Sequence, residues 1–324
     1  MASGTATAGR VETPWAVGRH APSVRRTGLR ALWHSPRRRK DLWAFLLLAG
    51  PNVALIVAFC WRPVVLNLQY ATLDWTLGNQ TARFVGLRNF VEFLTGEGGR
   101  VLWTTLLFTV FTVGGSMVLG LLLALVLNRR LVGTTFARSA VFAPFVLSGV
   151  GVGLVWVFIF DPTVGVLSNV MGRLHVTMPQ WFLQPGPALA MVCLVFVWKN
   201  LGYCAVIYLA GLQSVPGDVL EAAALDGAGA ARRFWRITLP LLSPVTFFLL
   251  ITTILSSLQA FDLIRIMTPL NPGTTTLMYD VYLQAFGGYN RGGYSAALAT
   301  ILFAILVVVT VAQVRFLGRR VHYA

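Results

Sequence analysis

Lys199, a lysine inside a very apolar stretch, is the residue of this sequence whose type and position most suggest binding of a charged group. Lys199 lies near the middle of an apolar run at 188–212 and is followed by Asn200 and Tyr203. An unpaired ammonium near the centre of a bilayer costs ~3 kcal/mol or more, so such a group usually faces a wet cavity or a partner charge. The position predicts one of two roles. Lys199 attracts an anionic solute such as a phosphate, or it makes a structural ion pair or a contact with a partner protein.

A second polar set lies on the apolar run at 239–261. Four small or hydroxyl-bearing residues recur there at the spacing of one helical face: Thr253, Ser256, Ser257 and Ala260. Asn200 and Tyr203 share one helical face in the same way, so the two faces are candidate polar surfaces, with Arg265 and Arg291 as outer candidates for contact with an anion. Small and hydroxyl residues also mediate ordinary packing between membrane helices, and this alternative stays open.

One long polar segment, Glu221 to Pro244, interrupts the apolar second half of the chain. Pro216 and Asp218 upstream suit a helix start, and Glu221 would place a negative charge in the first turn. Gly227 permits a sharp turn. The three alanines at 222–224 leave a small-residue surface on which another protein could pack. The segment predicts a docking element, unless it is a solvated loop whose alanines merely favour helix.

The sequence offers no catalytic or metal-ligating set. Its two lysines, Lys40 and Lys199, are followed by Asp and Asn, so neither completes a phosphate-binding loop. The four histidines and three cysteines are scattered without metal-ligand spacing. We therefore expect no enzyme activity and no cofactor on this chain.

The composition points to a membrane protein. Hydrophobic residues make up 56% of the 324 residues and charged residues 11%, against roughly 25% charged in a soluble domain. Stretches of ~20 apolar residues can each cross a ~30 Å hydrocarbon core as helix. We expect an all-α protein with six spans, at about 42–61, 101–127, 139–160, 188–212, 239–261 and 294–317.

The distribution of charge predicts how the chain is oriented. The net charge is +15, and nine of the 26 basic residues precede Asp41, next to the first span. Basic residues there hold a loop in the cytoplasm, which favours a topogenic role over nucleic-acid binding. With the N-terminus inside, 18 basic residues fall in cytoplasmic segments and seven in outer loops. We therefore predict cytoplasmic termini, a mostly disordered basic tail at 1–41, a six-span domain at 42–324 and a cytoplasmic loop at 213–240.

Several motifs in this chain are similar to those of ABC-importer permeases. Glu221–Ala223 and Asp226–Ala228 resemble the EAA loop of that family, and Phe84–Phe90 resembles a motif of its carbohydrate branch. Within the branch, Val197–Asn200 and Thr274–Leu277 resemble the A-type permease of glycerol 3-phosphate importers. The resemblance covers about residues 42 to 324.

The resemblance implies a type I importer permease in a prokaryotic cell membrane. Expected partners are membrane lipid, a second permease subunit, an ATPase dimer that holds ATP and Mg, and an extracytoplasmic solute-binding protein. The ATPase contact would fall on Glu221, Ala222, Ala223, Asp226, Gly227 and Ala228. The two polar faces correspond to the solute pocket of carbohydrate relatives, so the resemblance implies a mid-membrane solute path along Lys199, Asn200, Tyr203, Thr253, Ser256, Ser257 and Ala260. The implied solute is glycerol 3-phosphate or a glycerophosphodiester. A disaccharide, oligosaccharide or amino sugar is the alternative within the class, and a stand-alone secondary transporter is the alternative outside it.

Overall fold

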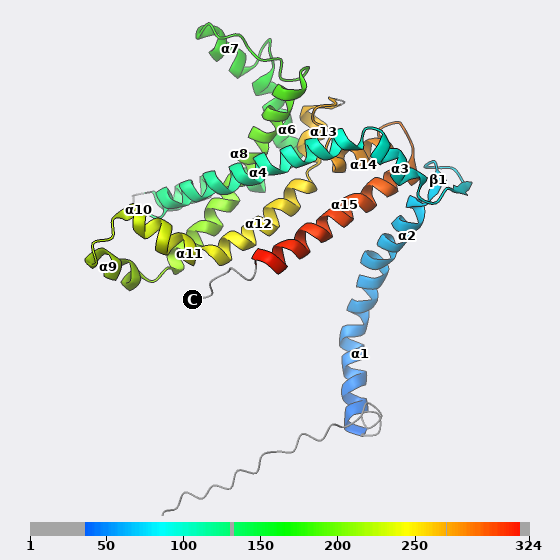
Figure 1. Cartoon of the computed structure of the whole chain (residues 1–324), viewed down its shortest axis with the longest axis horizontal. Coiled ribbons are helices and arrows are strands. Elements are labelled where there is room, and N and C mark those ends of the chain that lie inside the picture. Colours follow the sequence, from blue (N-terminus) through cyan, green and yellow to red (C-terminus); the bar gives the residue numbers. More distant parts are fainter. Residues whose placement is uncertain (1–35, 130–132, 270, 318–324) are drawn as a thin grey trace, which may run out of the picture. The chain divides into compact units, whose positions relative to one another are not determined.

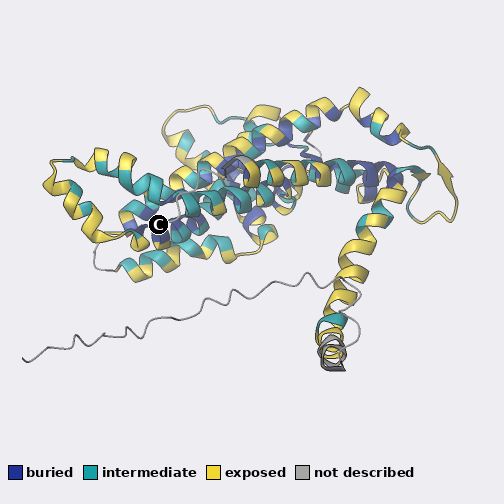
Figure 2. Ribbon diagram, turned by 60° about the horizontal axis from the view of Figure 1, so that its bottom comes forward, coloured by how far each residue is buried: buried dark blue, intermediate teal, exposed yellow. Residues whose placement is uncertain are grey.

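The computed structural model describes residues 36–129, 133–269 and 271–317, and the chain divides into two compact units, Met1–Arg62 and Pro63–Ala324. The described part of the first unit is helical, with α1 (Pro36–Ile56) followed by the π-helical turn η2 (Val57–Trp61) (Figure 1). Trp43, Phe45, Leu47 and Leu48 of α1 are all exposed, and the helix is coloured as exposed along most of its length (Figure 2). A helix that is apolar all round is typical of a membrane span. Most of the predicted basic tail, residues 1–35, lies outside the described residues.

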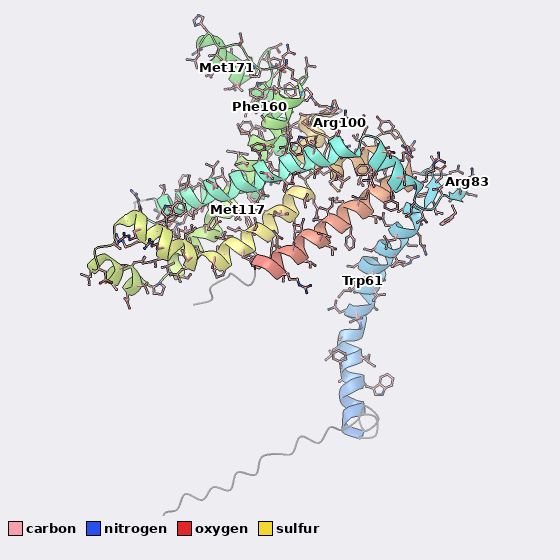
Figure 3. All side chains as sticks on the ribbon, in the orientation of Figure 1. Trp61, Arg83, Arg100, Met117, Phe160 and Met171 are labelled. Carbon is pink, nitrogen blue, oxygen red and sulfur yellow. The ribbon has the colours of Figure 1, made fainter. Side chains whose placement is uncertain are left out.

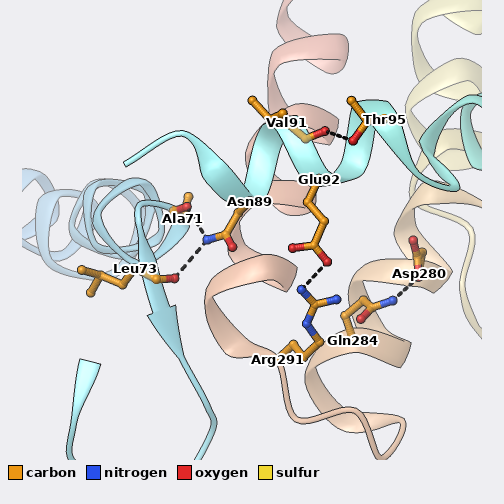
Figure 4. Close-up of polar contacts among 9 residues, drawn as sticks. All are labelled: Ala71, Leu73, Asn89, Val91, Glu92, Thr95, Asp280, Gln284 and Arg291. Atoms are coloured by element: carbon orange, nitrogen blue, oxygen red, sulfur yellow. Dashed lines mark hydrogen bonds and ion pairs between the residues drawn. The ribbon is translucent and has the colours of Figure 1, made fainter. Parts of the chain in front are cut away.

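The second unit opens with α2 (Arg62–Ala71), a hairpin and α3 (Arg88–Thr95). The hairpin pairs β1 (Leu73–Trp75) antiparallel to β2 (Ala82–Phe84), and it is a small addition to the expected all-α fold. Buried Asn89 donates hydrogen bonds to the carbonyls of Ala71, at 2.9 Å, and Leu73, at 3.0 Å (Figure 4). The asparagine of the Phe84–Phe90 motif therefore joins α3 to the chain that leaves α2.

Four long helices form the centre of the second unit. They are α4 (Gly98–Leu127), α8 (Pro185–Ser214), α12 (Ser243–Leu258) and α15 (Gly292–Ala312). Helix α4 packs against α8 and α12, and α14 (Leu277–Phe286) packs against α15. The boundaries of α8 follow from two prolines, since Pro185 suits a first helical position and Pro216 disfavours helix at the residue before it.

The third predicted span is not one straight helix. It consists of α5 (Thr134–Val146) and α6 (Gly149–Phe160), which meet at 98°. Pro144 removes a helical hydrogen bond near the end of α5, and Leu147 and Ser148 then adopt extended backbone angles. At 1.5 Å per residue the halves are ~20 and ~18 Å long, so neither alone crosses a ~30 Å core. The expected single helix at 139–160 was wrong in this respect.

Counted by length and composition, five described helices can cross a membrane, or six if the bent pair is one span. This agrees with the six predicted spans, although the first extends to Ala71 and the fifth to Met267 through α13 (Asp262–Met267). The connecting segment after α6 contains α7 (Val166–Arg173). In Figure 3, Met171 of α7 lies farther from the central helices than Phe160 at the end of α6.

Close backbone packing holds the first half of the broken span against α8. A Cβ atom at Gly202 of α8 would overlap the carbonyl oxygen of Val141 in α5, so a side chain there would force the two helices apart. We expect Gly202→Ala to destabilise the protein by about 1–3 kcal/mol and to lower its thermal midpoint in detergent. Gly114→Ala on α4 is the matched control, because a Cβ there meets no atom within 4 Å. Equal midpoints for the two variants would contradict this account.

Candidate functional site

A polar cavity of about 250 Å³ lies where α6, α8, α12 and α13 approach one another. Its charged and polar lining consists of Lys199, Asn200, Ser256, Gln259 and Asp262. The aromatic rings of Phe196 and Phe261 also line it. Lys199 is thus half-buried beside a cavity, as expected for a charged residue in the middle of a span.

Lys199 caps the C-terminal end of α5, the first half of the broken span. Its Nζ donates a 2.8 Å hydrogen bond to the carbonyl oxygen of Phe145, in the last turn of α5. It also lies 5.4 Å from the centre of the Phe145 ring. The last carbonyls of a helix lack intrahelical partners and carry partial negative charge, so a cation is favourable there.

Asp262 occupies the complementary position at the second half. It is the first residue of α13, and it lies so close to Gly149, the first residue of α6, that a Cβ on Gly149 would be 3.0 Å from Asp262 Oδ2. A carboxylate is favourable beside the positive end of a helix. The two ends of the break therefore face side chains of opposite charge from α8 and α13. In hydrocarbon, interrupted backbone is tolerated where protein or a water-filled cavity satisfies it.

The predicted solute-path residues divide between two environments. Ser256 and Ala260 line the cavity together with Lys199 and Asn200. Tyr203 lies one turn further along α8, where its ring stacks on Phe145 at 4.8 Å between centroids.

Thr253 and Ser257 are instead buried, and their hydroxyls are used in packing. Ser257 Oγ lies 2.8 Å from Thr112 Oγ1 of α4, and Thr253 donates to the carbonyl of Leu249 in its own helix. The four residues therefore do not all line the cavity, since Ser256 lines it while Ser257, its neighbour in α12, faces Thr112 of α4. Packing inside the protein accounts for two of the four residues, Thr253 and Ser257.

The two outer arginines lie in different surroundings. Arg265 of α13 stacks over the rings of Tyr282, at 4.7 Å, and Phe261, at 5.7 Å, so it lies beside an aromatic ring of the cavity. Arg291 does not line this cavity. It forms a 2.6 Å ion pair with Glu92 of α3 (Figure 4).

Arg291 belongs to a second polar cavity, of about 390 Å³, near the starts of α4 and α15. Asp280 of α14 is buried in its wall and accepts a 3.1 Å hydrogen bond from Gln284. Burial raises the pKa of Asp280 above its usual value, and the Gln284 hydrogen bond opposes that shift. The ion pair to Glu92 ties α3 to the loop that holds Arg291, and the Arg291 amide donates to the carbonyl of Gln284 in α14.

The polar segment after α8 folds into two short helices, α9 (Gly217–Leu225) and α10 (Ala230–Arg233). Gly227 takes a left-handed φ of +79° just after α9. The Ala228 amide bonds to the Ala223 carbonyl and the Gly227 amide to the Ala224 carbonyl, at 2.9 and 3.1 Å. This is the Schellman arrangement, in which a glycine ends a helix and its last carbonyls are satisfied. The predicted helix start, at Pro216 and Asp218, is confirmed, but Asp218 rather than Glu221 supplies the acid of the first turn.

The six predicted docking residues form a surface at this turn. Glu221, Ala222, Asp226 and Gly227 are exposed, and Ala223 and Ala228 are half-buried. Leu225 projects between them with 89% of its surface exposed. Beneath the turn, Arg233 donates to the carbonyl of Leu220 and ties α10 to α9.

Two polar residues of the cavity, Asp262 and Gln259, were not among the predicted site residues. Asp262 lies at the predicted end of a span, and Gln259 lacks the helical spacing of the hydroxyl set. Gly149, at the break in the third span, also lines the cavity, and Pro144 and the Ser148-Gly149 pair are the sequence signals for that break.

The fold and these two sites define a multi-span membrane permease with a polar cavity between its spans. The chain belongs to the family described as "Binding-protein-dependent transport system inner membrane component", whose model matches residues 77–323. It is therefore a multi-pass membrane permease of the bacterial ABC-importer class, and such permeases are not enzymes.

Individual relatives are similar over most of their length. The chain is 37% identical over 281 residues to the sn-glycerol-3-phosphate transport system permease protein UgpA of Agrobacterium fabrum, covering 86% of this chain and 95% of that protein. It is 33% identical to the protein of the same name from Yersinia pestis, covering 87% and 96%.

Solved structures show the same fold. A chain of a bacterial ABC transporter that imports the acidic polysaccharide alginate matches with a TM-score of 0.76 at 23% identity, covering 87% of this chain and 99% of that one. A chain of the bacterial alginate transporter in complex with its pentasaccharide-bound periplasmic protein matches equally, at 22% identity, covering 89% and 97%.

Proposed function

We propose that this chain is one of two permease subunits of an ATP-driven importer for glycerol 3-phosphate or a glycerophosphodiester. The observation that carries the proposal is Lys199, a cation beside a polar cavity in the middle of a span. An ammonium binds phosphate as a point charge. Relatives named for sn-glycerol-3-phosphate transport, at 33–37% identity, support the same solute class.

The size of the cavity supports a small solute. Sites for drug-sized ligands commonly enclose ~300–1,000 Å³. The cavity of this chain is smaller, at about 250 Å³. It suits a glycerol ester of phosphate better than an extended oligosaccharide.

The energy for transport would come from an ATPase dimer that holds ATP and Mg. We propose that it docks on the surface formed by α9, the Gly227 turn and α10. Support comes from the exposure of that surface and from the excess of basic residues in the segments assigned to the cytoplasm. With this orientation the Arg291 cavity faces outward, where an extracytoplasmic solute-binding protein would deliver the solute.

An oligosaccharide or amino-sugar permease is the second candidate. Phe261 at the cavity and Tyr282 lie 4.7 Å apart between ring centroids, and such rings can stack on a sugar. The phosphate-ester and sugar candidates differ in whether the solute must be anionic.

The test is ATP hydrolysis by the complete complex of both permeases, ATPase dimer and binding protein in lipid nanodiscs. We expect glycerol 3-phosphate or glycerophosphocholine to stimulate hydrolysis and neutral sugars to leave it at the basal rate. Stimulation by a sugar alone would favour the second candidate, an oligosaccharide or amino-sugar permease. Uptake that persists in vesicles without the ATPase subunits would instead indicate a stand-alone transporter.

A further inference from the structure

The cavity beside the break in the third span carries opposite charges on opposite elements. Lys199 enters it from α8 and Asp262 from the start of α13, and the two charges interact electrostatically. Within the described ranges of the chain, no direct ion pair joins them. The cavity therefore presents a separated cation and carboxylate to whatever enters it.

The end of the cavity at Lys199 offers unused hydrogen-bond donors. A lysine ammonium has three N–H donors, and the bond to the Phe145 carbonyl uses one. Asn200 donates a side-chain N–H to the carbonyl of Phe196, so the free donors at this end are chiefly those of the ammonium. This end suits an anionic oxygen group.

The end of the cavity at Asp262 offers hydrogen-bond acceptors. Asp262 is exposed to the cavity, and among the described residues no donor group bonds to its side chain. Its position beside Gly149 places it against the positive end of α6, where a carboxylate is favourable. An ionised carboxylate is acceptor-only and repels a second anion. This end suits a group with hydrogen-bond donors, such as hydroxyls.

We propose that Asp262 is a specificity-determining residue, which accepts hydrogen bonds from the hydroxyl groups of the solute while the solute's anion lies at Lys199. The solute would then bind in one orientation, with its charged end toward α8 and its hydroxyl end toward α13. This inference rests on the proposed function, because it assumes an anionic polyol. It adds that the cavity recognises the hydroxyl groups of the solute, through Asp262, as well as its charge.

The test is competition for binding of labelled glycerol 3-phosphate to the nucleotide-free complex in nanodiscs, with no binding protein present. Competitors are unlabelled glycerol 3-phosphate and n-propyl phosphate, which keeps the phosphate and lacks the hydroxyls. Hydrogen bonds to a charged group favour their ligand by about tenfold or more. We expect the wild-type complex to prefer glycerol 3-phosphate by at least about tenfold, and Asp262→Asn to reduce that ratio to within about threefold of unity.

Two further variants keep the result interpretable. Asp74→Asn removes an exposed carboxylate on β1, away from the cavity lining, and should keep the wild-type ratio. Asp262→Glu retains the acceptor and should keep a preference for glycerol 3-phosphate. If Asp262→Asn weakens both competitors alike and leaves the ratio unchanged, Asp262 is structural and the proposal is overturned. A wild-type complex that binds no phosphate ester at all would contradict the proposed function itself.

Discussion

Replacing Gly227 with valine is expected to abolish most of the solute-stimulated ATP hydrolysis of the complex while the permease still folds. Gly227 has a φ of +79°, a region that a β-branched residue scarcely adopts, at a cost of about 1–3 kcal/mol. A Cβ there meets no atom within 4 Å, so the effect comes from backbone strain rather than from a clash. Opening the turn would displace Asp226 and Ala228 from the docking surface. We expect stimulation to fall at least about tenfold in reconstituted complexes.

Two matched substitutions isolate the backbone effect. Gly227→Asn should retain most stimulation, because asparagine tolerates left-handed angles. Gly229→Val places the same side chain two residues further, where φ is −63° and the space is also open. A Gly227→Val complex with normal stimulation would remove the segment from the coupling mechanism. An equal loss in both valine variants would contradict the explanation by backbone strain.

Replacing Lys199 with methionine is expected to raise the half-saturating concentration of glycerol 3-phosphate by about ten- to hundredfold. A hydrogen bond to a charged group contributes about 1.5–3 kcal/mol, and methionine keeps much of the lysine's length without its charge. The measurement is stimulated ATP hydrolysis over a range of solute concentrations. Ser257→Ala serves as control, because that hydroxyl faces Thr112 of α4 and should leave the concentration unchanged.

The same variant separates the two roles of Lys199. If its role is confined to closing the end of α5, the methionine variant loses thermal stability through the unpaired Phe145 carbonyl, with an unchanged half-saturating concentration. If it binds the solute, affinity falls more than stability does. An unchanged affinity would remove Lys199 from the solute path.

Much of the fold follows from local patterns in the sequence. Runs of apolar residues fix the spans, and Pro185, Pro216 and Gly227 fix helix ends, because their backbone preferences act within a few residues. The turn at Gly227 was predictable for the same reason. Its hydrogen bonds join residues five or fewer positions apart.

The solute cavity was harder to predict because it depends on tertiary packing. An apolar run such as 139–160 has the same composition whether it is straight or bent, and Pro144 shows where helix weakens but not by what angle the chain turns. The separation of Ser256 from Ser257 likewise depends on which neighbour each one faces. Hydroxyl spacing on a single helix carries no information about α4.

The turn at Gly227 also bears on how motion would pass to the proposed ATPase partner. The Gly227 and Ala228 amides are already bonded to carbonyls of α9, and Arg233 already holds α10 to α9, in the chain by itself. A partner that binds this preorganised element loses little free energy to ordering it. Displacement of the partner can then be transmitted as rigid-body movement of α9 and α10, rather than being absorbed by a segment that must first fold.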